Sequence, residues 1–172
     1  MKRARHFALG LILLASAAQA NPAHTATGGK LCGEGTFRFF GFTLYDAKLY
    51  GSCRAPVFEQ PFALELKYQR NFTRAQLVQS SLDELERMNA LPDEATRTRW
   101  EHDMQQAFAD VKAGDTFTGH YHPEEGARFY LNGEPTAQIR DPLFARHFFG
   151  IWLDRETRAP GLRASLLGEA RP

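Results

Sequence analysis

The sequence predicts an α+β fold in which a layer of helices covers one face of an antiparallel β-sheet. Aromatic, β-prone runs occur at residues 36–50 and 62–68 and return at residues 116–140, whereas residues 73–111 have a helical apolar period. Asn132-Gly133, between two of the later runs, is typical of a tight hairpin turn. The predicted order is therefore a β-hairpin, a strand, two helices, three strands and two helices, in one domain at residues 31–172.

The first hairpin is predicted from two runs, Thr36–Phe40 and Thr43–Tyr50, that flank Gly41-Phe42. A turn at Gly41-Phe42 places Arg38 opposite Tyr45. Because directly paired side chains lie about 5 Å apart at Cβ, we expect this arginine and tyrosine to share one face of the sheet.

Two cysteines, Cys32 and Cys53, lie at the ends of this hairpin. We expect them to form a disulfide that closes the hairpin, since the N-terminal sequence described below indicates export and cysteines of exported chains are usually paired. The sequence contains no CxxC motif, so we infer no redox chemistry.

The next segment changes from strand to helix at Asn71. Phe62–Tyr68 alternates between apolar and polar residues and predicts a half-buried strand. Thr73 and Gln76 form a capping box that begins a helix. Leu91-Pro92-Asp93 separates it from a second helix, for which Gly114 is the expected end. The apolar faces that we expect to enter the core comprise Leu77, Val78, Ser81, Leu82, Leu85 and Met88 in the first helix, and Trp100, Met104, Ala107, Phe108 and Val111 in the second.

The C-terminal half returns to strands before it ends in helices. Asp141-Pro142 is an N-cap followed by proline at the first helical position. The expected elements are strands Thr116–His122, Ala127–Leu131 and Thr136–Arg140, a helix Pro142–Leu153 and a short helix Gly161–Leu167.

The N-terminus has the features of a secretory signal peptide at residues 1–20. Lys2, Arg3 and Arg5 precede an apolar run at Phe7–Ala17, and Ala18-Gln19-Ala20 is a small-residue cleavage site. The apolar run is shorter than the roughly 20 residues needed to span a bilayer, which favours cleavage over a retained anchor. We expect a periplasmic or secreted protein whose residues 21–30 are flexible.

The net charge expected after signal cleavage bears on which classes of molecule the protein binds. Cleavage would remove three of the 21 basic residues and leave 18 against 20 acidic residues, a net charge of −2. This composition disfavours nucleic acid or anionic lipid surfaces as the main partner. No sequence feature indicates a cofactor.

Several motifs together resemble the bacterial chalcone isomerase-like proteins. They are GEGTFRFFGFTLYDAKLYG, LVQSSLDELER, KAGDTFTGHY, ARFYLNGEP and FFGIWLD…LRASLLG, in that order. The resemblance covers nearly all of residues 31–168. It implies the chalcone isomerase fold, a long antiparallel sheet with helices on one face and a ligand cleft between sheet and helices.

The resemblance also implies which positions line the cleft. In plant chalcone isomerase an arginine attracts the phenolate, and hydroxyl and amide side chains polarise the ketone and line the cleft. The arginine corresponds to Arg38, and the other positions fall on Tyr45, Thr73, Ser80 and Ala159, none of which keeps its residue. A fixed donor to the reacting oxygen contributes roughly 3–4 kcal/mol, so we expect no chalcone isomerase activity and assign no catalytic residue.

Non-catalytic relatives of this fold bind fatty acids through an arginine and a tyrosine. The resemblance therefore implies a binder of a small apolar carboxylate, with Arg38 and either Tyr45 or Tyr68 as the donors. The tyrosine of those relatives falls near Thr73, which leaves the pair open. The simpler alternative is that Arg38 pairs with an acidic residue on the sheet face, Asp46 or Glu65.

Two other functions stay open, and one possible metal site is considered. The chain could be an intramolecular lyase or isomerase for another enone, with Arg38 and Tyr45 as its polar groups, or an envelope scaffold whose cleft is filled by its own side chains. His120 and His122 face the same side of a strand, but no third metal ligand is evident, so we predict no metal. The charged run Asp154–Arg158 is expected to be a solvated helix end.

Overall fold

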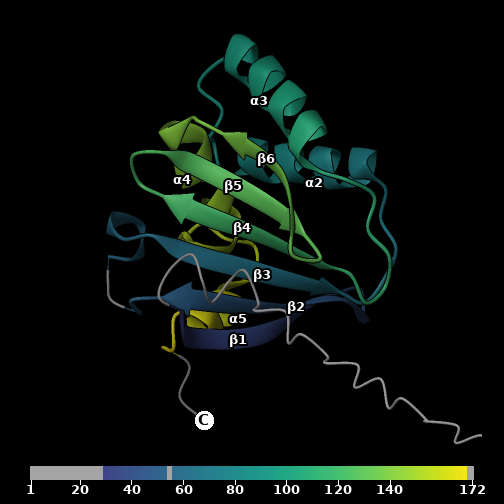
Figure 1. Cartoon of the computed structure of the whole chain (residues 1–172), viewed down its shortest axis with the longest axis vertical. Helices are drawn as coiled ribbons and strands as arrows, with labels where there is room; N and C mark the ends of the chain where they lie inside the picture. Colours follow the sequence, from purple (N-terminus) through teal and green to yellow (C-terminus); the bar gives the residue numbers. More distant parts are fainter. Residues whose placement is uncertain (1–28, 54–55, 170–172) are drawn as a thin grey trace, which may run out of the picture.

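A six-stranded antiparallel sheet with the sequential order β1-β2-β3-β4-β5-β6 forms the centre of the protein (Figure 1). The computed structural model describes residues 29–53 and 56–169; the expected signal peptide and most of the expected flexible segment lie outside them. The strands are β1 (Lys30–Phe39), β2 (Phe42–Gly51), β3 (Phe62–Tyr68), β4 (Thr116–His122), β5 (Gly126–Leu131) and β6 (Glu134–Ile139). The predicted α+β order of elements is confirmed.

The helices lie on one face of this sheet (Figure 1). They are α2 (Arg74–Arg87), α3 (Glu94–Ala107), α4 (Pro142–Leu153) and α5 (Pro160–Leu166), and a short 3-10 turn, η1, spans Val57–Glu59. No helix within 29–53 and 56–169 is both long and apolar enough to cross a bilayer.

The first hairpin turns one residue earlier than expected. Phe40 and Gly41 have φ of 46° and 81°, the left-handed values of a type I′ turn, and Phe39 pairs with Phe42. An irregularity between Phe37 and Arg38 then brings Phe37, not Arg38, opposite Tyr45. The expected pairing of Arg38 with Tyr45 is wrong, because a one-residue shift turns a side chain to the opposite face.

The disulfide is confirmed. The Cys32 and Cys53 sulfurs are 2.10 Å apart and their Cα atoms 5.0 Å apart. It joins the start of β1 to the residues that follow β2, and thus closes the open end of the hairpin.

Strand β3 has the expected bounds but is buried on both faces except at Lys67. The prediction of a half-buried strand is wrong because side chains of the neighbouring strands cover its second face, as Tyr50 of β2 does opposite Ala63. Its cross-strand neighbours on β4, which include Thr118 opposite Glu65, are themselves buried.

Helix α2 begins at the expected capping box: the Thr73 side chain accepts from the Gln76 backbone and the Gln76 side chain accepts from the Thr73 backbone. Helix α3 ends at Ala107, seven residues before Gly114. The chain leaves the helix early because Val111 pairs with Phe72 through two 2.9 Å backbone hydrogen bonds. Gly114 instead has φ 96° in the turn before β4.

The core fills the space between sheet and helices. Asp141 caps α4, and the buried residues of that helix include Phe144, Phe148 and Phe149. A Cβ at Gly119 would lie 2.8 Å from the Phe149 ring, so this glycine permits α4 to approach β4. Between α2, α4 and strands β1–β4 the side chains leave a cavity.

Candidate functional site

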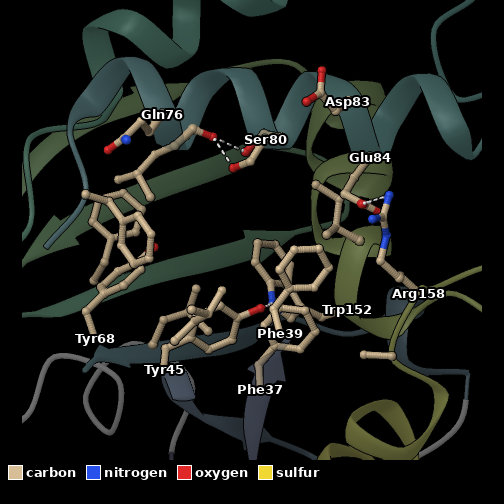
Figure 2. A pocket seen from close by; sticks show the side chains of 18 of the residues that line it. Phe37, Phe39, Tyr45, Tyr68, Gln76, Ser80, Asp83, Glu84, Trp152 and Arg158 are labelled. Carbon is tan, nitrogen blue, oxygen red and sulfur yellow. Dashed lines mark hydrogen bonds and ion pairs between the residues drawn. The ribbon is translucent and has the colours of Figure 1, made fainter. Parts of the chain in front are cut away.

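A cavity of about 450 Å³ lies between α2 and strands β1–β4 (Figure 2). This volume is in the range of roughly 300–1,000 Å³ that is usual for small-molecule sites. Its apolar wall comprises Phe37, Phe39, Leu44, Leu66, Phe72, Leu77, Phe108, Phe117, Phe148, Ile151, Trp152 and Ala159. The chain therefore does not fill its cleft with its own side chains, as the scaffold hypothesis requires.

Two tyrosine hydroxyls lie inside this apolar wall. Tyr45 and Tyr68 are cross-strand neighbours on β2 and β3, with ring centroids 5.8 Å apart. The Tyr45 hydroxyl accepts a 2.9 Å hydrogen bond from Trp152 Nε1, which leaves its own proton available. No described residue hydrogen-bonds to the Tyr68 hydroxyl.

Both phenols are held in the neutral form. Burial raises the pKa of Tyr45, and the nearby Glu84 adds to the rise, although the Trp152 hydrogen bond opposes it. Burial, and then the neighbouring Tyr45, raise the pKa of Tyr68. Each hydroxyl therefore remains a hydrogen-bond donor at neutral pH, available to an acceptor on a ligand.

The α2 side of the cavity offers acceptors. Ser80 and Ser81 both donate to the Leu77 carbonyl, at 3.1 and 2.8 Å (Figure 2). Their oxygens can then only accept from a ligand.

An ion pair lies at one end of the cavity. Arg158 Nη2 is 2.6 Å from Glu84 Oε1 (Figure 2). Arg87 Nε is 2.9 Å from Glu84 Oε2. Thr157 holds the adjoining loop by donating to the Ile151 carbonyl at 2.7 Å and accepting from the Ala159 N–H at 3.2 Å. Two guanidinium groups thus contact the Glu84 carboxylate. Of the two, only Arg158 lines the cavity, together with Glu84 and Asp83.

Three of the five predicted binding residues line the cavity: Tyr45, Tyr68 and Ser80. Thr73 is outside it, because its hydroxyl caps α2. Arg38 is exposed and is not among the described residues that line the cavity. Its neighbours Phe37 and Phe39 point inward, so Arg38 points to the other face of the sheet.

Both the carboxylate-binding and the isomerase hypotheses placed Arg38 beside Tyr45. This pair is not formed. The alternative pairing of Arg38 with Asp46 is also not formed. The two oxygens of Asp46 accept from the Thr36 hydroxyl at 2.6 Å and from Gln69 Nε2 at 2.7 Å.

Three residues of the site were not predicted as such. Trp152 belongs to a predicted helix but was not singled out for the site, and Arg158 was expected in a solvated charged run. Glu84 could have been found, since it lies seven residues after Leu77 and thus on the same helical face. Nothing in the local sequence indicates Arg158, whose position depends on the loop between α4 and α5.

The histidine pair on β4 does not form a metal site with its neighbours. His122 Nδ1 accepts from the Glu124 and Glu125 backbone at 3.2 and 3.3 Å. His120 Nε2 is buried with no hydrogen-bond partner. Across 29–53 and 56–169, no three histidine, cysteine or acidic side chains are grouped to hold a metal ion.

Comparison with known proteins agrees with this architecture. A sequence model of the family described as chalcone isomerase-like matches residues 22–168. The solved structure of an Arabidopsis thaliana fatty-acid binding protein superposes with a TM-score of 0.66 at 11% identity, over 85% of this chain and 90% of that chain. At this identity the likeness shows the fold alone. No curated protein matches the sequence.

Proposed function

Since the chain belongs to the chalcone isomerase-like family, and its cavity is apolar with a few polar groups, we propose that it binds a small apolar carboxylate such as a fatty acid. The observation that carries the proposal is the apolar cavity itself, with two neutral phenol donors inside and a guanidinium group at one end. A site of this kind, mostly apolar with a few placed donors, suits an amphiphile. The structural likeness to a fatty-acid binding protein supports the same ligand class.

Arg158 takes the role that the sequence suggested for Arg38. Glu84 needs only one of its two arginine partners for charge balance, so Arg158 retains the capacity to pair with a ligand carboxylate. The tail then extends along the sheet beneath α2. Tyr45 and Tyr68 donate to any oxygen that the ligand carries further in.

The test is ligand binding by the purified protein after removal of co-purifying lipid. Native mass spectrometry identifies what co-purifies, and titration with palmitic acid gives the affinity. Loss of a charged hydrogen bond costs about 1.5–3 kcal/mol. Arg158→Gln should therefore weaken binding about ten- to hundred-fold.

Arg38→Gln is the matched control, because it removes an exposed arginine that does not line the cavity. In vesicle-free solution it should leave the affinity for palmitic acid unchanged. Absence of any co-purifying lipid, together with no stabilisation by any fatty acid, would contradict the proposal. If Arg38→Gln and Arg158→Gln weakened the binding of palmitic acid equally, the assignment of Arg158 as the partner of the ligand carboxylate would be contradicted.

We further propose that the protein is exported to an oxidising compartment, the periplasm or the cell exterior. Support comes from the signal-like N-terminal sequence and from the Cys32–Cys53 disulfide. Mass spectrometry of the protein from cell fractions checks this. A chain that begins at Asn21 in the exported fraction is the expected result, and an uncleaved chain in the cytosol is the contrary one.

A further inference from the structure

Three phenylalanines project at the tip of the β1–β2 hairpin. Phe40, Phe42 and Phe39 are 86%, 58% and 41% exposed, and they are three of the five large apolar side chains that the structure shows as exposed. Phe39 and Phe40 contact edge to face, with ring centroids 4.5 Å apart. We call these three residues the aromatic tip.

The turn chemistry of the aromatic tip does not serve the fold. Phe40 and Gly41 adopt nearly the same positive φ values, 46° and 81°, as Asn132 and Gly133 at 51° and 88° in the β5–β6 turn. Asparagine is favoured at this position, whereas a bulky residue with positive φ is strained. The second hairpin uses the favoured residue, and the first places an exposed phenylalanine there instead. Local rules are broken in this way most often at functional positions.

The surroundings of the aromatic tip are basic. Arg70 lies over the Phe42 ring, with its guanidinium carbon 4.9 Å from the ring centroid. Arg38 adjoins the tip on β1 and is exposed. The nearby carboxylate of Asp46 is already engaged by two hydrogen bonds. Two arginines thus adjoin the tip, Arg38 in the chain and Arg70 over the Phe42 ring, although the mature chain as a whole is acidic.

The aromatic tip is continuous with the cavity. Phe39 belongs to the tip and also lines the cavity with Phe37. Beyond the turn the space is open, since a Cβ at Gly41 would meet no atom within 4 Å. A projecting turn with apolar side chains and a basic rim matches the interface of an anionic bilayer, where apolar groups enter the acyl boundary and cations meet headgroups.

We propose that the aromatic tip docks reversibly on a lipid bilayer that contains anionic lipid. Phe40 and Phe42 insert at the headgroup boundary, and Arg38 and Arg70 contact anionic headgroups. Docking brings the end of the cavity lined by Phe39 to the membrane surface. The surface interaction itself needs no ligand in the cavity, so it can fail or succeed separately from ligand binding.

The experiment is flotation of the purified protein with vesicles of phosphatidylcholine and phosphatidylglycerol, compared with phosphatidylcholine alone. The natural chain should float with the anionic vesicles and be released by salt. Phe40→Asn should lower the partition coefficient about ten- to hundred-fold, as expected for one large apolar side chain. Arg70→Gln should lower it about five-fold.

Phe40→Asn creates an Asn-Gly turn, so its melting temperature should equal or exceed that of the natural chain, which separates lost docking from lost fold. It should also retain its affinity for palmitic acid in solution. Leu143→Ser is the matched control, because Leu143 is 50% exposed on another part of the molecule, and it should float like the natural chain.

Three results would overturn the proposal. In the first, the protein floats with neither type of vesicle. In the second, it floats equally well with both types. The third is a dimer of the natural chain in solution that Phe40→Asn converts to a monomer, because the tip would then be an interface between two copies.

Discussion

The hydrogen bond between Tyr45 and Trp152 is the only described side-chain hydrogen bond that links α4 to β2 within the cavity wall, and its energy can be measured. Tyr45→Phe removes one oxygen and leaves the ring, which packs 5.2 Å from Phe37 and 5.8 Å from Tyr68 between centroids. Trp152 Nε1–H then loses its acceptor at a partly buried position of the cavity wall. An unsatisfied buried donor costs about 1–3 kcal/mol, so we expect a loss of that size in the free energy of unfolding.

Urea unfolding of four chains measures this energy: the natural chain, Tyr45→Phe, Trp152→Phe and the double variant. The coupling energy should be about 1 kcal/mol. The melting temperature of Tyr45→Phe should fall by about 2–4 °C for each kcal/mol lost.

Tyr68→Phe is the matched control, because its hydroxyl has no hydrogen-bond partner among the described residues. It should change the free energy of unfolding by less than about 0.5 kcal/mol. If Tyr45→Phe unfolds at the same urea concentration as the natural chain and the coupling is zero, the tyrosine–tryptophan bond does not stabilise the fold.

Three further predictions concern the rest of the fold. Cys32 and Cys53 are separated by 21 positions. Replacing both by serine should lower the free energy of unfolding, measured with urea, by about 3 kcal/mol. A reductant should then have no further effect on the stability of this variant. Gly33→Ala should destabilise by about 2 kcal/mol or more, since its Cβ would collide with the α5 backbone, whereas Gly161→Ala, which meets no atom, should be neutral or stabilising. Burial, and then a nearby arginine, lower the pKa of His120 from 6.5 to about 4. Because the unfolded chain binds more protons between these values, the free energy of unfolding should fall on acidification through that window, and His120→Gln should flatten the curve. An unchanged stability after disulfide removal, a neutral Gly33→Ala or an unaltered pH curve would each contradict its prediction.

Local signals in the sequence determined most of the elements. The capping box at Thr73 and the Asp141-Pro142 start of α4 act within a few residues, so they can be identified without the tertiary structure. The Asn132-Gly133 turn was equally clear. The end of α3 was not, because it is set by the pairing of Val111 with Phe72, 39 positions away in the numbering.

The residues of the candidate site likewise fall into those that the sequence identified and those that it did not. The resemblance to the family identified Tyr45 and Ser80, and strand alternation placed Tyr68 on the apolar face of its strand; all three line the cavity. It failed at Arg38, where a turn at Phe40-Gly41 and an irregularity in β1 reverse the side chain. A register shift of one residue exchanges the two faces of a strand, and no composition signal reveals it.

What the sequence by itself determined is the list of helices and strands, their order and the apolar faces that they bury, because these follow from interactions between near neighbours in the chain. Only the tertiary structure decided which cation reaches the cavity. Arg158 comes from a loop whose path is fixed by Thr157 and by its ion pair with Glu84 on α2. Such contacts join residues far apart in the chain, so their geometry exists only once the sheet, α2 and α4 have packed together.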